Sequence, residues 1–349
     1  MSRILASLIC LVAFSTLAFA QTETKEEEEK NFKFKPVPYL NYSRTGGFEF
    51  GAVPMAMYKV NKNDTISPES LSGLVGMYTT EGNWAAVFFQ KFYLSEDRWR
   101  VTAAGGYAFV GFQFYLDGIG DFIDYSTEAS FIMVKTERRL FKKVYGGFRI
   151  ARGETETFFG GLPDPKITLF NNLGLSLSND LRDDVYYPYS GSISEVTFNF
   201  NPEWLENEFV SEKIEIEYNK YLSMQNSRDV LAFRGKLGMG LGDLAFEQQF
   251  IVGNEDIRGY TQGEFRGNNI AAIQGEYRWN LKERIGLVGF AGVATIWDGI
   301  NEDDNGRLLP GIGAGFRFNV FPDNHMNIGL DAAVGDGDWG IYFRIGEAF

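Results

Sequence analysis

Residues 271–281 read AAIQGEYRWNL, and apolar and polar side chains alternate along this stretch. Successive side chains of a β-strand point to opposite faces, so this alternation produces one apolar face and one polar face. Tyr277 and Trp279 lie on the apolar face, and Glu276 and Arg278 lie on the polar face. The pattern extends over about 11 residues, which is the length of a tilted strand that crosses a membrane.

The same alternation recurs at residues 193–200, 213–219, 312–320 and 339–345. A soluble β-sandwich alternates in the same way, but its strands typically contain about 5–6 residues. The segments here extend over about 10–14 residues, close to the membrane-crossing length. The sequence therefore predicts an all-β protein, a transmembrane antiparallel β-barrel. Aromatic residues gather at the segment ends, where membrane barrels carry interfacial girdles, at Trp84, Tyr93, Trp99, Trp279, Trp297 and Trp339.

Counting the segments gives about 16 strands, with closures of 12 or 14 strands as alternatives. An even number places both termini on the periplasmic side and the longer connections outside the cell. The longest connections expected there are 109–126, 154–165 and 242–267. Pro36, Pro38 and Pro54 favour edge or bulge positions for the first two strands. The expected strands are 36–44, 46–59, 69–79, 83–94, 98–108, 127–138, 142–153, 166–179, 190–201, 211–223, 229–241, 268–281, 284–297, 308–320, 324–333 and 339–349.

The N-terminus has the pattern of a cleaved secretory signal over residues 1–20. Arg3 precedes an apolar stretch, which ends in the small-residue cleavage site Ala18-Phe19-Ala20. The apolar stretch of about 14 residues is too short to span a bilayer. Cys10 does not indicate a lipoprotein, because the preceding Ile9 is not small. We expect an acidic flexible leader at 21–33 and the barrel at 34–349.

Composition excludes several classes of function. The chain has 46 acidic and 33 basic side chains, so a nucleic-acid partner is not expected. With one cysteine and one histidine, we expect no disulfide framework, no metal site and no cofactor. His325 falls in an expected turn, and no serine sits in a Gly-x-Ser-x-Gly motif, so we predict no catalytic residue and no enzyme activity.

Three motifs resemble those of the bacterial surface-antigen barrel family, the superfamily of BamA- and TamA-like outer-membrane assembly factors and two-partner-secretion transporters. The resemblance covers residues 166–349 well and 34–165 by strand pattern alone. The motifs are the turn with Asp180, Arg182, Asp183, Pro188 and Gly191, the loop Ile257-Arg258-Gly259-Tyr260, and the C-terminal strand for barrel insertion with Phe343, Ile345, Gly346 and Phe349.

The resemblance implies that the Arg-Gly-Tyr loop folds into the lumen. A guanidinium there needs a carboxylate, and Glu276 on the next strand is the candidate anchor. The family often has an aspartate near the position of Gly292, which this chain lacks. The alternative is an ordinary turn with a solvated Arg258. The polar faces predict either a self-neutralising lumen network or a selective channel lining, made of Glu215, Glu217, Arg234, Lys236, Glu276, Arg278, Arg317, Asp331 and Arg344.

Assembly factors of this family receive clients through POTRA domains, and only about 13 residues stand between the expected signal and the barrel. We therefore expect a member that lacks POTRA domains, located in the outer membrane. The implied role is outer-membrane biogenesis, by protein insertion, translocation or lipid movement, through a seam between Gly46-Gly47 and residues 339–349. Implied partners are outer-membrane lipid, unfolded outer-membrane proteins, a periplasmic protein or a second copy. The alternative is a passive pore or structural outer-membrane protein.

Overall fold

The computed structural model describes most of the chain from Phe32 onward. The expected signal and the leader up to residue 31 lie outside the described residues, as do Gly46 of the expected seam and residues 254–255 before the Arg-Gly-Tyr motif. The first strand begins at Phe32, two residues before the expected start of the barrel. The described residues are 32–43, 47–116, 118, 121–159, 164–224, 229–253, 256–261, 264–282 and 284–349.

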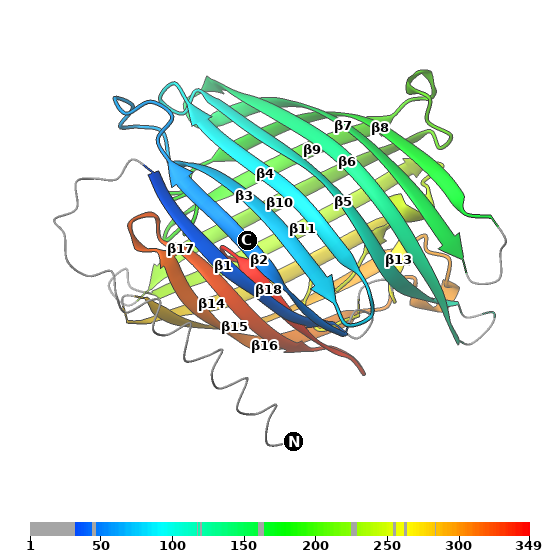
Figure 1. The fold of residues 1–349 in the computed structure, drawn as a ribbon. Helices are drawn as coiled ribbons and strands as arrows, with labels where there is room; N and C mark the ends of the chain where they lie inside the picture. Colours follow the sequence, from blue (N-terminus) through cyan, green and yellow to red (C-terminus); the bar gives the residue numbers. More distant parts are fainter. Residues whose placement is uncertain are drawn as a thin grey trace.

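Sixteen antiparallel strands form one sheet that curls into a barrel (Figure 1). This confirms the predicted fold and strand number. Two further strands, β12 and β13, pair with each other inside the connection between β11 and β14. The strands are β1 Phe32–Ser43, β2 Gly47–Tyr58, β3 Ser70–Thr79, β4 Trp84–Leu94, β5 Trp99–Leu116, β6 Asp121–Phe141, β7 Val144–Phe159, β8 Lys166–Asp180, β9 Gly191–Asn201, β10 Ser211–Met224, β11 Asp229–Gly242, β12 Phe250–Ile251, β13 Arg266–Gly267, β14 Asn269–Lys282, β15 Ile285–Trp297, β16 Leu309–Phe321, β17 Met326–Val334 and β18 Trp339–Ile345.

The described part of the chain contains no helix that is long and apolar enough to span a membrane.

Strands extend into two of the three long connections that we expected. β5 has 18 residues and β6 has 21, and their ladder continues to the pair Leu116 and Asp121. β7 likewise extends to Phe159. The expectation of loops was wrong at 109–116, 121–126 and 154–159, where the chain is strand. About 9–11 residues suffice to cross the bilayer, and backbone pairing can continue beyond it. The connection 243–268 remains long.

The two faces of each strand have the predicted character. Ile273 and Ile312 are exposed on the outside of the barrel, with 63% and 60% of their surface accessible. Gln274, Glu276 and Arg278 alternate with such residues along β14 and are buried in the lumen. The apolar outer surface and the charged interior are therefore products of the same period of two.

The barrel has two ends with different connections. We call one the turn end, because it carries the start of β1, the end of β18 and the connections that follow even-numbered barrel strands, such as β16 to β17 at residues 322–325. We call the other the loop end, because it carries the connection 243–268.

β1 and β18 are the two edges of the sheet, and among the described residues no ladder of strand pairs joins them. They meet through aromatic contacts instead. The ring of Tyr42 stacks on Trp339 with centroids 5.6 Å apart, and Tyr39 meets Phe343 edge-on at 4.9 Å. In Figure 1 the first strands, in blue, lie beside the last strand, in red.

The outer face of β18 is covered at the turn end. Arg344 contacts Asp331 in the lumen, so strand alternation places Phe343 and Ile345 on the outside. These two residues are nevertheless half-buried against a cluster that includes the opposite edge of the sheet. β1 and β2 contribute Val37, Val53, Met55 and Met57 to this cluster, and β16 and β17 contribute Val320, Phe321 and Met326.

The covering face belongs to the inside of the β1–β2 hairpin. Leu40 and Phe48 are exposed on the outer face of this hairpin, and Val37 and Met55 lie on the opposite face. The inner face of the hairpin thus packs on the outer face of β18. Toward the turn end, β18 therefore passes beneath β1.

The prolines of the first two strands interrupt pairing without changing the register. Pro36 pairs with Pro54 between β1 and β2. Between β2 and β3, Ala52 pairs with Gly76 and Met55 with Gly73, with no pair at Val53 and Pro54. A proline has no N–H to donate to the ladder, which explains the gap.

The last strand is shorter than expected. We predicted a strand from Trp339 to Phe349, but β18 ends at Ile345. Gly346 adopts φ +83°, a left-handed conformation that favours glycine. The chain leaves the sheet there, and residues 347–349, which we call the C-terminal tail, turn into the barrel.

Candidate functional site

The connection 243–268 crosses the lumen from β11 toward the opposite wall. A short helical turn follows at Phe246–Gln248. The ring of Phe246 packs edge-on against Tyr125 of β6, with the ring centroids 5.4 Å apart. Thr157 of β7 donates a hydrogen bond to Glu247 at 3.1 Å. The described residues of the connection also form a buried core with the inner faces of β14, β15 and β16, made of Phe250, Val252, Ile257, Tyr260, Phe265, Ile270, Ala272, Ala294, Ile296 and Leu309.

The tip of this connection, Ile257–Tyr260, requires glycine in two places. Gly259 has φ +120°, and a Cβ atom there would lie 2.6 Å from the carbonyl carbon of Val334. On the wall facing the tip, a Cβ atom at Gly311 would lie 2.3 Å from the carbonyl oxygen of Arg258. The tip therefore lies directly on the backbone of the barrel wall.

Arg258 is completely buried and has three polar partners. Its guanidinium donates to Asp331 at 2.6 Å, to Glu276 at 2.8 Å and to Gln274 at 2.6 and 3.1 Å. Its guanidinium carbon lies 3.3 Å from the ring centroid of Phe290. Buried guanidinium groups need this degree of compensation, because an unpaired one is strongly unfavourable.

The structure brings Arg258 next to Glu276, the partner that we expected from the sequence. Asp331 and Gln274 are partners that sequence reasoning missed, although Asp331 was in the expected lumen lining. No carboxylate stands at Gly292, where the family often has one, because Ile257 fills that space. A Cβ atom at Gly292 would lie 2.8 Å from the Cδ1 atom of Ile257.

The carboxylate of Asp331 is the centre of a wider network. Arg317 of β16 and Arg344 of β18 also donate to it, the latter at 2.9 Å. Arg278 donates to Glu276 at 2.8 Å. All nine charged residues of the predicted lumen lining have an oppositely charged partner within 3.7 Å. This geometry corresponds to the self-neutralising network rather than to a row of unpaired channel charges.

The C-terminal tail adds a third carboxylate to the network. Glu347 accepts hydrogen bonds from Arg317 at 2.8 Å and from Asn327 at 2.7 Å. The main-chain oxygen of Phe349 accepts one from Arg278 at 2.7 Å. Of the C-terminal motif, Phe343 and Ile345 therefore lie at the seam, whereas Gly346 marks the bend and Phe349 lies inside the barrel.

The turn motif forms the connection from β8 to β9, residues 181–190, which we call the mouth loop. Arg182 holds Asp180 through two hydrogen bonds of 2.8 and 3.0 Å, and Arg100 donates to the same carboxylate at 2.7 Å. Asp183 accepts from the backbone N–H groups of residues 189 and 190 at 3.0 and 3.1 Å. Gly191 has φ +101°, and a Cβ atom there would lie 2.1 Å from the carbonyl oxygen of Leu181.

The mouth loop crosses the turn end of the barrel. On one side, Tyr186 donates a hydrogen bond to the carbonyl of Glu69, next to β3, at 2.5 Å. On the other side, Asn280 of β14 donates to Tyr187 at 3.0 Å. Pro188 lies between Tyr187 and Tyr189, whose rings pack edge-on at 4.9 Å. Both ends of the lumen are thus crossed by a connection that is fixed to opposite walls.

Within the described residues, no group of histidine, cysteine, aspartate and glutamate side chains has the arrangement to hold a metal ion. The nine charged residues of the predicted lumen lining are each paired with an opposite charge. The site therefore fits mechanical and electrostatic roles in which loops, strands and tail are held together.

A charged lumen, a loop that folds into it and sixteen strands define the class of protein, which is a β-barrel of the outer-membrane type. A family model of the Omp85 superfamily domain matches residues 86–349, and the chain belongs to this superfamily. The predicted family is thereby confirmed. Proteins of the superfamily are outer-membrane β-barrels with roles in protein assembly and transport. A search of curated proteins found no match.

Solved structures show the same fold. BamA from Haemophilus ducreyi lacking POTRA domains 1–3 is 11% identical, with a TM-score of 0.57 over 91% of this chain and 70% of that chain. CdiB from Acinetobacter baumannii is 12% identical, with a TM-score of 0.59 over 90% of this chain and 60% of that chain. CdiB from Escherichia coli is 13% identical, with a TM-score of 0.62 over 92% and 63%. The chain thus spans less than two thirds of either CdiB chain.

Proposed function

We propose that this protein acts in the outer membrane as a biogenesis barrel, which inserts or translocates other proteins through a lateral opening between β1 and β18. The observation that carries this function is the seam. In a sheet of sixteen strands, every neighbouring pair shares a ladder except the two edges. We assign the turn end to the periplasmic side, because the first strand β1 starts there and the last strand β18 ends there, as an even strand number requires.

The chemistry of the seam favours reversible opening. Breaking a backbone ladder inside a bilayer leaves unsatisfied N–H and C=O groups, each of which costs several kcal/mol. At this seam the contacts are between side chains, such as Tyr39 with Phe343 and Tyr42 with Trp339. Apolar side chains that separate there meet lipid, which is also apolar. An exposed strand edge can in turn pair with an incoming strand.

The lumen contacts argue against a passive pore. The connection 243–268 is fixed to β6 and β7, and the mouth loop is fixed near β3 and to β14. These connections obstruct the axial route through the barrel. A lateral route between the sheet edges leaves them in place.

A disulfide scan across the seam tests this function. The only cysteine is Cys10, in the expected signal, so engineered pairs are free of background in the processed protein. The seam pairs place cysteines at positions 39 and 343, or at positions 42 and 339. Formation of each disulfide is monitored on gels. The control pair replaces Ala332 and Ile341, which are partners in the regular ladder between β17 and β18.

The measurement is insertion of an unfolded eight-stranded outer-membrane barrel into liposomes that contain each variant. We expect oxidation of a seam pair to abolish the acceleration over empty liposomes, and reduction to restore it. Oxidation of the control pair should have no effect. Equal acceleration by the oxidised and reduced seam variants would exclude lateral opening.

A further inference from the structure

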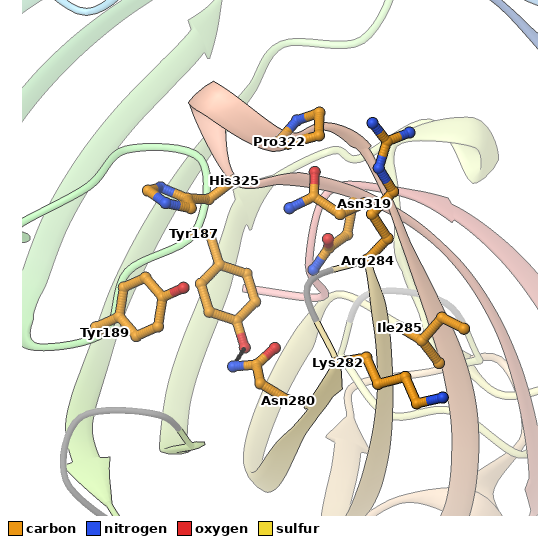
Figure 2. Close-up of a pocket in the computed structure, with 10 residues that line it drawn as sticks. Tyr187, Tyr189, Asn280, Lys282, Arg284, Ile285, Asn319, Pro322 and His325 are labelled. Carbon is orange, nitrogen blue, oxygen red and sulfur yellow. Dashed lines mark hydrogen bonds between the residues drawn. The ribbon is translucent and has the colours of Figure 1, made fainter. Parts of the chain in front are cut away.

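A cavity of about 910 Å³ opens at the turn end, between the mouth loop, the β14–β15 turn and the β16–β17 turn. Figure 2 shows the rings of Tyr187 and Tyr189 on one side of this cavity, with Lys282 and Arg284 on the other. We propose that this cavity binds the phosphate group of a membrane phospholipid. This site is independent of the lateral opening proposed above.

The described residues that line the cavity carry positive charge and include no carboxylate. Lys282 and Arg284 are the two cations, and the other lining residues are tyrosines, asparagines, an isoleucine, a proline and His325. Among the described residues, neither Lys282 nor Arg284 forms an ion pair; Glu283, between them in the sequence, lies outside that set. An anion that entered the cavity would therefore meet two cations that are not already neutralised.

Of the described carboxylates nearby, Asp183 and Asp229 accept hydrogen bonds from backbone N–H groups and hydroxyls. Three others face a cation or the histidine. Asp184 lies 3.2 Å from the Nδ1 atom of His325. Asp323 lies 3.2 Å from the ammonium group of Lys33 in β1. Glu347 is held by Arg317 at 2.8 Å. These acids do not compensate the cations of the β14–β15 turn.

An amide oxygen without a partner, on a partly exposed side chain, supplies a second indication of a polar ligand. The side-chain oxygen of Asn319, which lines the cavity, is buried and has no hydrogen-bond partner. The oxygen and nitrogen of an asparagine amide are interchangeable in shape, so a rotation of the amide presents its NH₂ group instead. An NH₂ group in that position can donate to a phosphate oxygen.

The neighbouring outer surface identifies the source of the phosphate. The ends of β14 and β15 expose Trp279, Leu281, Ile285 and Leu287 on the outer face. Tryptophan is enriched at the membrane–water boundary, and lysine or arginine just beyond an apolar belt lies at the level of the lipid headgroups. Ile285 also lines the cavity. A lipid can therefore place its acyl chains on the belt and its phosphate in the cavity.

The test uses the full-length barrel in detergent and measures lipid adducts by native mass spectrometry. The ligands are phosphatidylglycerol, diacylglycerol, which lacks the phosphate, and inorganic phosphate. The variants are K282Q/R284Q and Asn319→Leu. The matched control is K142Q/K143Q, since Lys142 and Lys143 form the β6–β7 turn at the same end, follow the exposed Leu140 and Phe141, and do not line this cavity.

We expect K282Q/R284Q to bind phosphatidylglycerol at least about tenfold more weakly than the parent chain, since two charge-assisted contacts are lost. Asn319→Leu should weaken binding less, and K142Q/K143Q should bind like the parent. Diacylglycerol should bind all four proteins equally. Unchanged binding by K282Q/R284Q, or an equal loss in K142Q/K143Q, would overturn the site.

The two sources of phosphate are separated by competition. We expect inorganic phosphate at the same concentration to leave the phosphatidylglycerol adduct in place, because it has no acyl chains to bury. Displacement of the lipid by inorganic phosphate would overturn the lipid assignment. If K282Q/R284Q does not fold, which its mobility on unheated gels reveals, the single variant Arg284→Gln and Asn319→Leu decide the result.

Discussion

Arg258 at the tip of the lumen connection donates a hydrogen bond to Asp331 of β17 over 2.6 Å, although 73 positions separate the two residues in the sequence. The same carboxylate holds Arg317 of β16 and Arg344 of β18. One aspartate thus joins the inserted loop to β16, β17 and β18, the last three strands of the sheet, of which β18 borders the seam. The position of the loop and the position of the sheet edge are physically coupled through it.

The first prediction concerns Asp331 itself. Asp331→Asn leaves the buried Arg258 and Arg317 and the partly buried Arg344 with one carboxylate fewer. Breaking a buried charge pair in this way costs about 3–5 kcal/mol. We expect a loss of that size in the free energy of unfolding, measured by urea titration in liposomes. The control is Asp336→Asn, whose pair with Arg307 is on the surface and should cost less than about 1 kcal/mol. Equal costs would show that the buried network does not stabilise the barrel.

The second prediction concerns conductance. Arg258→Ala removes the contacts that hold the loop tip to Glu276 and Asp331. We expect the parent barrel to conduct little in planar bilayers and the variant to show frequent larger openings. Arg98→Ala, which removes an exposed pair with Glu96, should behave like the parent. A large, stable conductance of the parent that Arg258→Ala leaves unchanged would contradict an obstructed lumen.

The number of strands, and the face to which each side chain points, were predictable from the sequence. Both depend on the alternation of apolar and polar residues within a single strand. Residues 271–281 display it without reference to any other part of the chain. The partners of Arg258 were only partly predictable. Glu276 lies on the strand that follows the loop, whereas Asp331 reaches Arg258 only after the barrel has closed. Its charge and facing were visible in the sequence, but its distance from the loop tip was not.

The course of the C-terminal tail illustrates the same limit. The alternation of β18 continues in the sequence toward Phe349, and nothing local separates a continued strand from an inward bend except Gly346. The bend is determined by Arg278 and Arg317, which lie on other strands and bind Phe349 and Glu347. Likewise, the lengths of β5 and β6 follow from their mutual pairing beyond the bilayer.

The third prediction tests the close contact at Gly259. Gly259→Ala forces an L-residue into φ +120° and places its Cβ atom 2.6 Å from the backbone of Val334. Strained backbone of this kind costs about 1–3 kcal/mol, and the displaced tip should also raise conductance as Arg258→Ala does. Gly337→Ala is the matched control, since Gly337 also has positive φ but faces open space. If the two alanine variants have the same stability and conductance, the tip does not pack on the wall.

The last prediction concerns the C-terminal tail and the seam. Glu347 binds Arg317 and Asn327 from inside the barrel, and thereby fixes the end of β18 beneath β1. Glu347→Gln removes a charge-assisted hydrogen bond, a contact worth about 1.5–3 kcal/mol. A change of about 1.4 kcal/mol in local opening alters amide hydrogen exchange about tenfold. We therefore expect the amides of β18 to exchange at least about tenfold faster in the variant, while those of β10 stay unchanged.

Glu212→Gln, at an exposed position of β10, should leave β18 as slow as in the parent. Exchange in β18 that Glu347→Gln does not accelerate would mean that the tail does not hold the sheet edge.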